Sequence, residues 1–525
     1  MGVASLGCRA QFGLDSIPIE VQVHLAAGLP QFNVVGLAAT EVKESRERVR
    51  AALVQSGYTL PPGRITVNLA PADLPKDSGR FDLTIALGIL WASGQLPEPA
   101  VVGEFLGELG LDGALRPVRG ALPTAMAIER SGCRLIAPQG NAAELALMSQ
   151  SESVRVAGTL ADVCAWWRGE ADLPTPATFL KDQACDKDIY HKEFSPEGLS
   201  DLSLDDVIGQ ALGKRALEVA AAGEHSLLYV GPPGCGKSIL ARRLPSLLPP
   251  PTEEERLQIA MMASLTSSTL ISDYAFERQK ECFSRPFRAP HHTASANALI
   301  GGGSRPIPGE ISLANGGVLF LDELPEFDRR VLEALREPLE SGTVAVARVG
   351  VRWEFPARCQ LVAAMNPCPC GYFGSALREC RCRPQEVACY RARLSGPLLD
   401  RIDLRVSLHA VNSAKSENHT RVEGQMNTVA VCERVAAARR LQQQRQGRSN
   451  CQLAAKDIEQ MGIAQEARSA LQRLAVRRAL SLRSQHRILR VARTLSDLQN
   501  PDSTAPITTS HVAEALQLRQ ALESD

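Results

Sequence analysis

The sequence predicts a multidomain α/β protein with an N-terminal α+β domain, a central parallel sheet wrapped by helices, and a C-terminal helical domain. Three observations favour this fold class. The chain has 525 residues, more than one hydrophobic core normally organises. Its middle alternates short apolar runs with helical patterns, which is typical of a parallel sheet between helices. Its last part, residues 428–525, is rich in Ala, Leu, Arg and Gln at helical spacing.

The composition limits the possible functions. Lys plus Arg and Asp plus Glu both total 58, so any nucleic-acid contact must come from a local patch or from charge concentrated inside a ring. The first residues lack a charged segment followed by an apolar stretch, and no apolar run long enough to span a membrane occurs. We therefore expect a soluble, cytoplasmic protein without a membrane partner, whose 14 cysteines are reduced thiols and one metal site.

The N-terminal residues 1–168 are predicted to fold as an α+β domain of their own. Runs of β-forming residues at 17–23 and 65–69 flank a helical pattern at 42–55. From 169 to 204 the periodicity fades into a polar stretch that contains prolines and charges. We interpret this stretch as a linker.

Residues 205–410 are predicted to form the parallel-sheet domain. Its clearest strands are the apolar runs at 226–230, 318–321 and 360–365. Residues 411–427 are polar and without a period, so we interpret them as a second linker. The helical residues 428–525 then form a lid domain.

The most specific motif is a phosphate-binding loop of the pattern G-x-x-x-x-G-K-[ST]. It follows an apolar strand and precedes a helical pattern, which is the context that this motif requires. Backbone N–H groups curl around a phosphate, Lys237 reaches the β- and γ-phosphates of ATP, and the Ser238 hydroxyl binds Mg²⁺. A glycine-rich turn without a ligand is the alternative. The predicted nucleotide-binding residues are Gly231, Pro232, Pro233, Gly234, Cys235, Gly236, Lys237, Ser238 and Ile239.

Two adjacent carboxylates end the apolar run at 318–321, where a buried strand would deliver them to one edge of the sheet. Asp322 is expected to position Mg²⁺, and Glu323 is expected to polarise the attacking water. The alternative is a pair of acids at a strand-to-helix turn, with Asp328 capping the next helix. Asn366 ends the third strand, where its amide could bind the same water or the γ-phosphate; otherwise it is a turn residue before a proline.

These strand-end motifs are followed by GPLLDRIDL at 396–404 and SLRSQHRILRVART at 481–494. In this order they resemble the magnesium-chelatase-like AAA+ family, and most closely its ComM/YifB group, over nearly the whole chain. The resemblance implies a hexameric, ATP-hydrolysing ring in which Arg401 is the arginine finger on the neighbour's γ-phosphate. It also makes Arg483 the sensor-2 arginine of the lid and Asn366 sensor 1. Without the family, Arg401 would be a surface or salt-bridged residue.

Residues 71–90 resemble the Lon-protease-like fold that precedes the motor in this group. That protease uses a Ser–Lys pair. Here the Pro-Lys-Asp of 75–77 is kept, but Arg80 stands where we would place the nucleophile. The later segment 107–123 supplies no lysine as the base, and Ser78 has no neighbouring base to activate it. We therefore predict a Lon-like domain without proteolytic activity.

Four cysteines form two close pairs separated by a short loop that contains glycines. Their thiolates could surround a tetrahedral Zn²⁺, although C-x-C is tighter than the usual spacing and Cys389 or a nearby His could replace one ligand. Solvent-facing reduced thiols are the alternative. Four protein ligands leave no open position for catalysis, so we predict a structural zinc that stiffens the segment between Asn366 and Arg401. The predicted zinc ligands are Cys368, Cys370, Cys380 and Cys382, and the predicted Mg²⁺ ligands are Ser238 and Asp322.

Two stretches near the ATP site carry arginines suited to a central pore. Residues 284–305 have the composition of an inserted loop, and residues 343–355 alternate like a hairpin. Repeated around a ring, such arginines would bind phosphate backbones without reading sequence. Ordinary solvated loop charge is the alternative, and a metal site at His291 and His292 lacks an evident third ligand. The candidate DNA-binding residues are Arg285, Arg288, Arg305, Arg348 and Arg352, with Trp353 beside them.

A DNA motor is the leading functional hypothesis. ComM-like proteins are associated with ATP-driven branch migration of DNA when incoming strands are integrated in natural transformation. The resemblance therefore implies a hexameric helicase acting on single-stranded or branched DNA. A protein-remodelling motor of magnesium-chelatase type is the second hypothesis, although a genuine chelatase subunit resembles only the AAA+ part. An ATP-dependent protease is the third, and the missing Ser–Lys pair opposes it.

Overall fold

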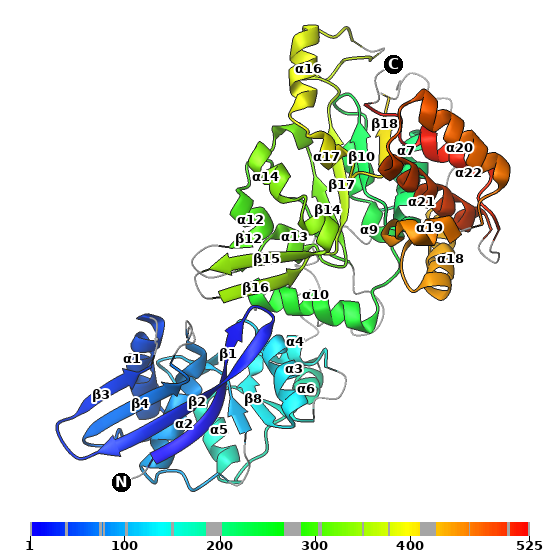
Figure 1. Cartoon of the computed structure of the whole chain (residues 1–525). Helices are drawn as coiled ribbons and strands as arrows, with labels where there is room; N and C mark the ends of the chain where they lie inside the picture. Colours follow the sequence, from blue (N-terminus) through cyan, green and yellow to red (C-terminus); the bar gives the residue numbers. More distant parts are fainter. Residues whose placement is uncertain are drawn as a thin grey trace. The chain divides into compact units, whose positions relative to one another are not determined.

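The chain forms two compact units (Figure 1). The computed structural model describes residues 3–36, 40–72, 76, 79–99, 103–148, 152–184, 202–266, 285–302, 307–348, 351–375, 378–409, 427–460, 462–500 and 505–522. The first unit contains the described residues up to 184, together with helix α10 (Glu253–Thr266) and residues 347–355. The second unit contains the other described residues.

A seven-stranded mixed sheet in the order β3-β4-β2-β1-β5-β8-β9 forms the centre of the first unit. Strand β2 is antiparallel to both β1 and β4, and the remaining neighbours are parallel. The strands of this sheet are β1 (Val3–Phe12), β2 (Asp15–Ala26), β3 (Gln31–Val35), β4 (Arg64–Ala70), β5 (Gly103–Phe105), β8 (Arg134–Pro138) and β9 (Val154–Ala157). A separate antiparallel pair is formed by β6 (Glu108–Leu109) and β7 (Leu115–Arg116). The helices are α1 (Thr40–Gln55), α2 (Asp82–Ala92), α3 (Ala121–Ser131), α4 (Ala142–Leu145), α5 (Leu160–Trp167) and α6 (Pro176–Ala184).

The sequence patterns explain these elements. Strand β2 alternates, so that Ile19, Val21 and Val23 are buried while their neighbours face outward. Helix α2 is apolar on nearly all sides because it packs against β1 and β2 inside the unit. The strands expected at 17–23 and 65–69 and the helix expected at 42–55 are confirmed as β2, β4 and α1.

The stretch 169–204, interpreted as a linker, starts as part of the first unit. It contains helix α6, whose Leu180 is buried in the same cluster as Leu135 and Val154, and Leu173 is buried beside Trp167. The helix is short and surrounded by prolines and charged residues, so its apolar spacing could not be recognised in the sequence.

A five-stranded parallel sheet in the order β11-β14-β17-β10-β18 forms the centre of the second unit. Its strands are β10 (Leu227–Val230), β11 (Phe287–Arg288), β14 (Val318–Leu321), β17 (Gln360–Met365) and β18 (Leu404–Ser407). A short pair in this unit is β12 (Gly301–Gly302) with β13 (Ile307–Pro308). A hairpin of β15 (Thr343–Arg348) and β16 (Val351–Pro356) leaves this unit and includes the residues 347–355 that belong to the first unit. The helices around the sheet are α7 (Ala211–Gly223), α8 (Lys237–Ala241), α9 (Leu244–Leu247), α12 (Ala296–Ile300), α13 (Glu310–Leu313), α14 (Arg329–Ala334), α15 (Pro338–Ser341), α16 (Pro384–Ala392) and α17 (Gly396–Leu399). The three predicted strands and the hairpin are confirmed.

The order of this sheet determines where a ligand binds. Strand β10 comes first in the chain but lies between β17 and β18, and the chain reaches β18 from β17, so the strand order reverses at β10. Ligands of open parallel sheets bind at the carboxyl ends of strands at such a switch point. Strands β10, β14 and β17 are buried along their whole length, as continuous apolar runs require.

The C-terminal part of the second unit is helical, as expected. Its helices are α18 (Thr428–Gln446), α19 (Ala455–Gln460), α20 (Gln465–Arg477), α21 (Leu482–Gln499) and α22 (Thr509–Gln517). Helices α18 and α21 both pack against α7, and their apolar side chains share one buried cluster with strand β10 (Figure 1). Among the described residues, no helix is both long and apolar enough to cross a membrane.

Two segments from the middle of the chain belong to the first unit. Ser264 of α10 is buried, and its carbonyl oxygen accepts a hydrogen bond of 2.8 Å from the Gly120 N–H. In the hairpin, Trp353 is buried and its ring centroid lies 5.2 Å from that of Phe12. The expectation that the hairpin presents Trp353 is therefore wrong, because the ring is covered by an aromatic partner.

Candidate ATP site and cysteine cluster

The phosphate loop leaves β10 at the carboxyl edge of the sheet and enters α8. Gly234 and Gly236 have φ values of 75° and 93°, in the region that side chains with a Cβ rarely adopt. Lys237 folds back over the loop, where its Nζ donates to the carbonyl oxygens of Gly231 at 2.8 Å and Pro232 at 3.0 Å. Burial lowers the pKa of Lys237, so an incoming phosphate would meet a partly desolvated ammonium group.

The side chains predicted at the ends of the three strands lie together around Lys237. The Ser238 hydroxyl donates to Asp322 Oδ2 at 2.7 Å, and Lys237 Nζ donates to Asn366 Oδ1 at 3.0 Å. A hydroxyl and a carboxylate are the hard oxygen donors that Mg²⁺ takes while it keeps several waters and phosphate oxygens. The arrangement can therefore hold a magnesium–triphosphate complex between β10, β14 and β17.

Glu323 has a partner that the sequence did not predict. Its Oε2 lies 3.3 Å from Nδ1 of His292, which follows β11, the parallel neighbour of β14. Glu323 also has φ of 53°, an uncommon value for a residue with a side chain and one that is often found at functional sites. The rings of His291 and His292 contact each other at a tilt of 33°, with centroids 4.1 Å apart, and Nδ1 of His291 lies 2.9 Å from Thr293 Oγ1. The two histidines thus contact the Glu323 carboxylate and the Thr293 hydroxyl.

Comparisons with known proteins agree with this geometry. The family profile described as "Magnesium chelatase, subunit ChlI" matches residues 203–416, and profiles for a ChlI subunit segment and the ChlI C-terminal part match 21–141 and 425–519. The chain is 44% identical over 521 residues to competence protein ComM of Haemophilus influenzae, covering 99% of this chain and 98% of that protein. The chain belongs to the ComM/YifB group of magnesium-chelatase-like AAA+ ATPases.

Two further proteins are similar to this AAA+ ATPase. Protein YifB of Salmonella typhimurium is 43% identical over 521 residues, which cover 99% of this chain and 97% of YifB. A shorter stretch of 96 residues is 33% identical to DNA replication licensing factor Mcm6 of Drosophila melanogaster, covering 18% of this chain and 10% of that protein.

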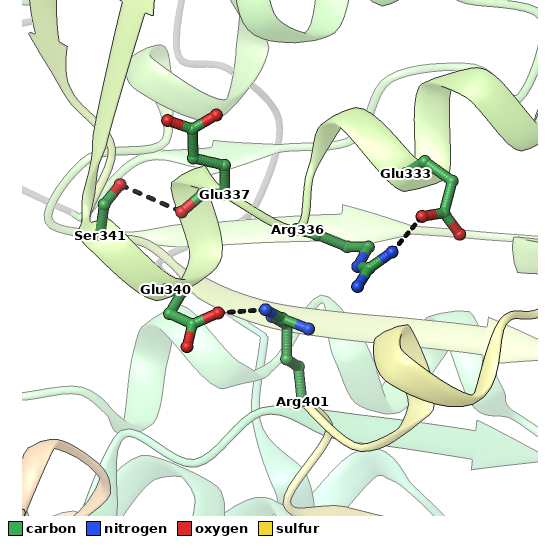
Figure 2. Close-up of a pocket in the computed structure, with 6 residues that line it drawn as sticks. All are labelled: Glu333, Arg336, Glu337, Glu340, Ser341 and Arg401. Carbon is green, nitrogen blue, oxygen red and sulfur yellow. Dashed lines mark hydrogen bonds and ion pairs between the residues drawn. The ribbon is translucent and has the colours of Figure 1, made fainter.

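The two arginines assigned through the family share one acceptor, Glu340. Arg401 donates from Nη1 to the Pro397 carbonyl oxygen at 2.9 Å and from Nη2 to the Glu340 carboxylate (Figure 2). Arg483 Nη2 lies 3.4 Å from the other oxygen of Glu340. The hydrogen bond from Arg401 lowers the pKa of Glu340, which stays a charged acceptor. Arg401 and Glu340 line an open pocket of about 410 Å³ with Glu333, Arg336, Glu337 and Ser341.

A buried ion network fixes helix α21 to the segment that carries Arg401. Arg487 donates to Asp403 Oδ1 at 2.7 Å, and His225 Nδ1 lies 3.0 Å from Asp403 Oδ2. Arg519 donates to the Asp403 carbonyl oxygen at 2.9 Å. Burial raises the pKa of Asp403, but His225 and Arg487 outweigh it and hold that pKa well below the usual range. The network places Arg483, one turn before Arg487, beside Arg401.

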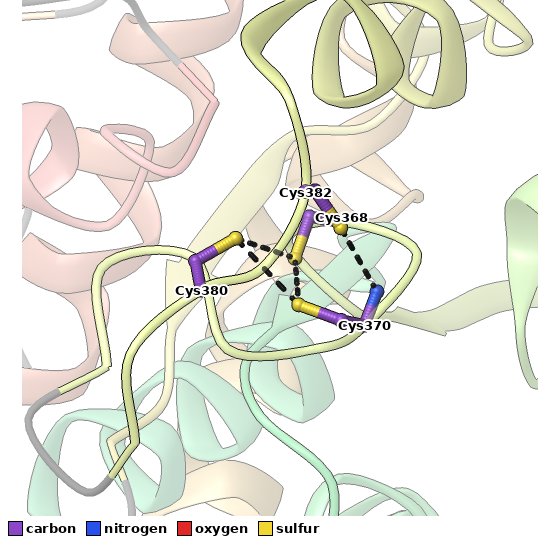
Figure 3. Close-up of side chains that lie close together, drawn as sticks. All are labelled: Cys368, Cys370, Cys380 and Cys382. Carbon is purple, nitrogen blue, oxygen red and sulfur yellow. Dashed lines mark hydrogen bonds between the residues drawn. The ribbon is translucent and has the colours of Figure 1, made fainter.

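The four predicted zinc ligands converge (Figure 3). The sulfur of Cys368 lies 3.4 Å from that of Cys370 and 3.7 Å from that of Cys380, and the sulfurs of Cys370 and Cys380 lie 3.6 Å apart. Thiolates around a tetrahedral Zn²⁺ at about 2.3 Å lie about 3.8 Å from one another, so this set fits the ion. The Cys370 N–H donates to Cys382 Sγ at 3.4 Å, as in many thiolate sites. Cys389 is exposed and outside the cluster.

The arginines predicted to contact DNA have different surroundings. Arg288 makes a double contact with Glu310 at 2.6 and 2.7 Å, and Arg285 donates to the carbonyl oxygens of Pro249 and Gly316 at 2.8 and 2.6 Å. Both guanidinium groups therefore bind acceptors within the protein and hold residues 285–288 in place. Arg352 is exposed. Arg305 and the side chain of Arg348 lie outside the described residues.

Residues 71–90, the segment for which a Lon-like fold was predicted, carry two buried basic side chains. Lys76 is buried, and its Nζ donates to the Pro71 carbonyl oxygen. Arg80, at the position expected for a nucleophile, donates to the Arg9 carbonyl oxygen at 3.4 Å and to that of Arg119. Burial lowers the pKa of Arg80 to about 10. Ser78 lies outside the described residues.

Proposed function

We propose that this ATPase is a hexameric motor that uses ATP hydrolysis to drive branch migration of DNA in the cytoplasm. The observation that carries the proposal is the combination of an assembled phosphate-loop site with 44% identity to a competence protein over 99% of the chain. Competence is the uptake of DNA, and the shorter match is to a DNA replication factor. Both names favour DNA as the substrate.

The chain's own residues have distinct tasks in ATP hydrolysis. The Lys237 ammonium group leaves the backbone carbonyl oxygens and the Asn366 side chain to bind the β- and γ-phosphates of ATP. A charged phosphate oxygen is a stronger acceptor for an ammonium group than a neutral carbonyl oxygen. Ser238 and Asp322, which are hydrogen-bonded to each other, would hold Mg²⁺, and the ion would supply positive charge against the phosphates. Glu323 orients and polarises the water, and Asn366 fixes it from the other side.

Arg401 acts on the ATP of the neighbouring subunit. Its contact with Glu340 gives the guanidinium group a resting partner near the surface, which the neighbour's γ-phosphate replaces when the ring assembles. Arg483 reaches the same carboxylate, so both arginines would face the same neighbouring nucleotide. The helical lid positions Arg483 through the buried Asp403–Arg487 pair.

DNA contacts arise from arginines repeated around the ring. Arg352 remains the best candidate among the described side chains, because Arg285 and Arg288 are engaged within the segment. Arg305 and Arg348 stay candidates from the sequence. The Lon-like first unit contributes no proteolysis in this proposal, and a Zn²⁺ held by the four cysteines is structural.

A mobile four-way DNA junction tests the proposal. Purified wild-type protein should convert the junction into its two duplex products with ATP and Mg²⁺, and Glu323→Gln should not, because it lacks the carboxylate that activates water. Hydrolysis of ATP without any conversion of the junction would contradict the DNA proposal and leave the ATPase assignment in place. A protein substrate would then be the next candidate.

A further inference from the structure

The cysteine cluster touches the phosphate loop directly. Gly371, which follows Cys370, has φ of 85°, and its backbone lies against the ring of Pro233. A Cβ on Gly371 would lie 2.6 Å from Pro233 Cδ and 2.8 Å from Pro233 Cγ, closer than real Cβ atoms come to such atoms. The cysteine loop therefore forms one wall of the phosphate loop.

The same loop also reaches the lysine of the ATP site. Asn366, two residues before Cys368, accepts from Lys237 Nζ at 3.0 Å. The segment from Asn366 to Gly371 thus contacts the phosphate loop at both of its ends, and Cys368 and Cys370 lie between these contacts. Cys368 is fully buried, so its sulfur cannot swing away without moving the backbone.

We propose that metal occupancy of the cysteine cluster sets the affinity of the phosphate loop for ATP. A Zn²⁺ bound to all four sulfurs would fix residues 366–371 in the position that supports Pro233 and Lys237, so that less conformational freedom is lost when a triphosphate binds. Without the metal the wall is less ordered and nucleotide affinity falls. This inference rests on the proposed zinc and nucleotide sites and adds a regulation that neither implies alone.

The metal arm of the test measures zinc content and nucleotide affinity on the full-length protein without DNA. Zinc is quantified by atomic absorption, and the Kd of a fluorescent ATP analogue is measured in excess Mg²⁺ before chelation, after chelation and after zinc is returned. Removal should raise Kd about tenfold, a difference of about 1.4 kcal/mol, and zinc should restore it. Cys380→Ser should reproduce the loss, whereas Cys389→Ser, outside the cluster, should match wild type.

A second arm perturbs the contact and leaves the ligands in place. Gly371→Ala should raise Kd with zinc content unchanged, because the new methyl group pushes on Pro233. Gly374→Ala is the matched control, since Gly374 has φ of 72° in the same loop but nothing within 4 Å of a Cβ. A wild-type protein without zinc, or zinc-free protein with unchanged Kd, would overturn the inference. Neither outcome bears on the DNA proposal, because no DNA is present.

Discussion

Glu340 accepts hydrogen bonds from both Arg401 and Arg483. A substitution of Glu340 therefore tests the hypothesis that Arg401 is an arginine finger, because it removes the charged acceptor that Arg401 has within its own chain. Its carboxylate is more than half exposed, so the ion pair with Arg401 contributes little to stability. A guanidinium group held by such a weak partner is available to a neighbouring phosphate.

Glu340→Gln should therefore leave hydrolysis by the assembled protein unchanged or faster, since it only releases Arg401. Arg401→Ala should lose hydrolysis by about 10³-fold, as removal of an arginine finger does. Steady-state phosphate release at saturating ATP measures both, with Glu337→Gln from the same pocket as the control. If Glu340→Gln is as inactive as Arg401→Ala, the ion pair is required for the active state and the resting-partner account is wrong.

Substitutions of Lys237 and Glu323 should have different effects on nucleotide binding and on hydrolysis. Lys237→Ala removes the group that binds the phosphates, so both nucleotide binding and hydrolysis should be lost. Glu323→Gln keeps the site's shape and removes the charge that polarises water, so binding should persist while hydrolysis falls about 10²- to 10⁴-fold. Equilibrium binding of a fluorescent ATP analogue, paired with phosphate release, separates the two. Normal hydrolysis by Glu323→Gln would disprove the role assigned to that carboxylate.

At the scale of elements, helix α21 depends on Asp403. A carboxylate whose pKa is lowered by folding adds stability above its unfolded pKa of about 3.9, and that stability is lost as pH falls below this value. The groups facing it are the His225 imidazole and the guanidinium groups of Arg487 and Arg519. Asp403→Asn should cost about 3 kcal/mol at pH 7, because it leaves buried cations without their anion.

The pH dependence of that cost is the sharper prediction. Urea unfolding of wild type and Asp403→Asn should show a constant difference between pH 8 and pH 5, and the difference should shrink only near pH 4 and below. A difference that shrinks between pH 8 and pH 5 would contradict the assignment of this stability to the Asp403 carboxylate.

Local sequence predicted the elements and the motif residues well, because each depends on neighbours in the chain. The strand ends that deliver Ser238, Asp322 and Asn366 follow from apolar runs and from the rule that parallel strands share a carboxyl edge. The family resemblance predicted Arg401 and Arg483, and the cysteine spacing predicted the cluster.

Pairings between distant segments could not be predicted in this way. The contact of His292 with Glu323 joins two loops, and Glu340 is an ordinary helical glutamate until Arg401 folds onto it. Composition suggested that Arg288 was free for DNA, because nothing in the sequence announces that Glu310 lies opposite. The burial of Trp353 against Phe12 likewise depends on a surface formed by a different part of the chain.

At the scale of the whole molecule, a DNA motor must couple DNA binding to ATP hydrolysis. The chain has no net charge, so the proposed DNA binding would depend on arginines brought together in a ring, and it should weaken as salt rises. Stimulation of hydrolysis by DNA reports this coupling without requiring that the products of branch migration be resolved.

The most direct test is ATP hydrolysis by the purified protein without DNA, with single-stranded DNA and with a four-way junction, each at low and high salt. We expect a several-fold increase in hydrolysis with DNA that diminishes at high salt and is absent in Lys237→Ala and Glu323→Gln. Hydrolysis that depends on Lys237 and Glu323 but is the same with and without DNA would contradict the claim that this ATPase is a DNA motor.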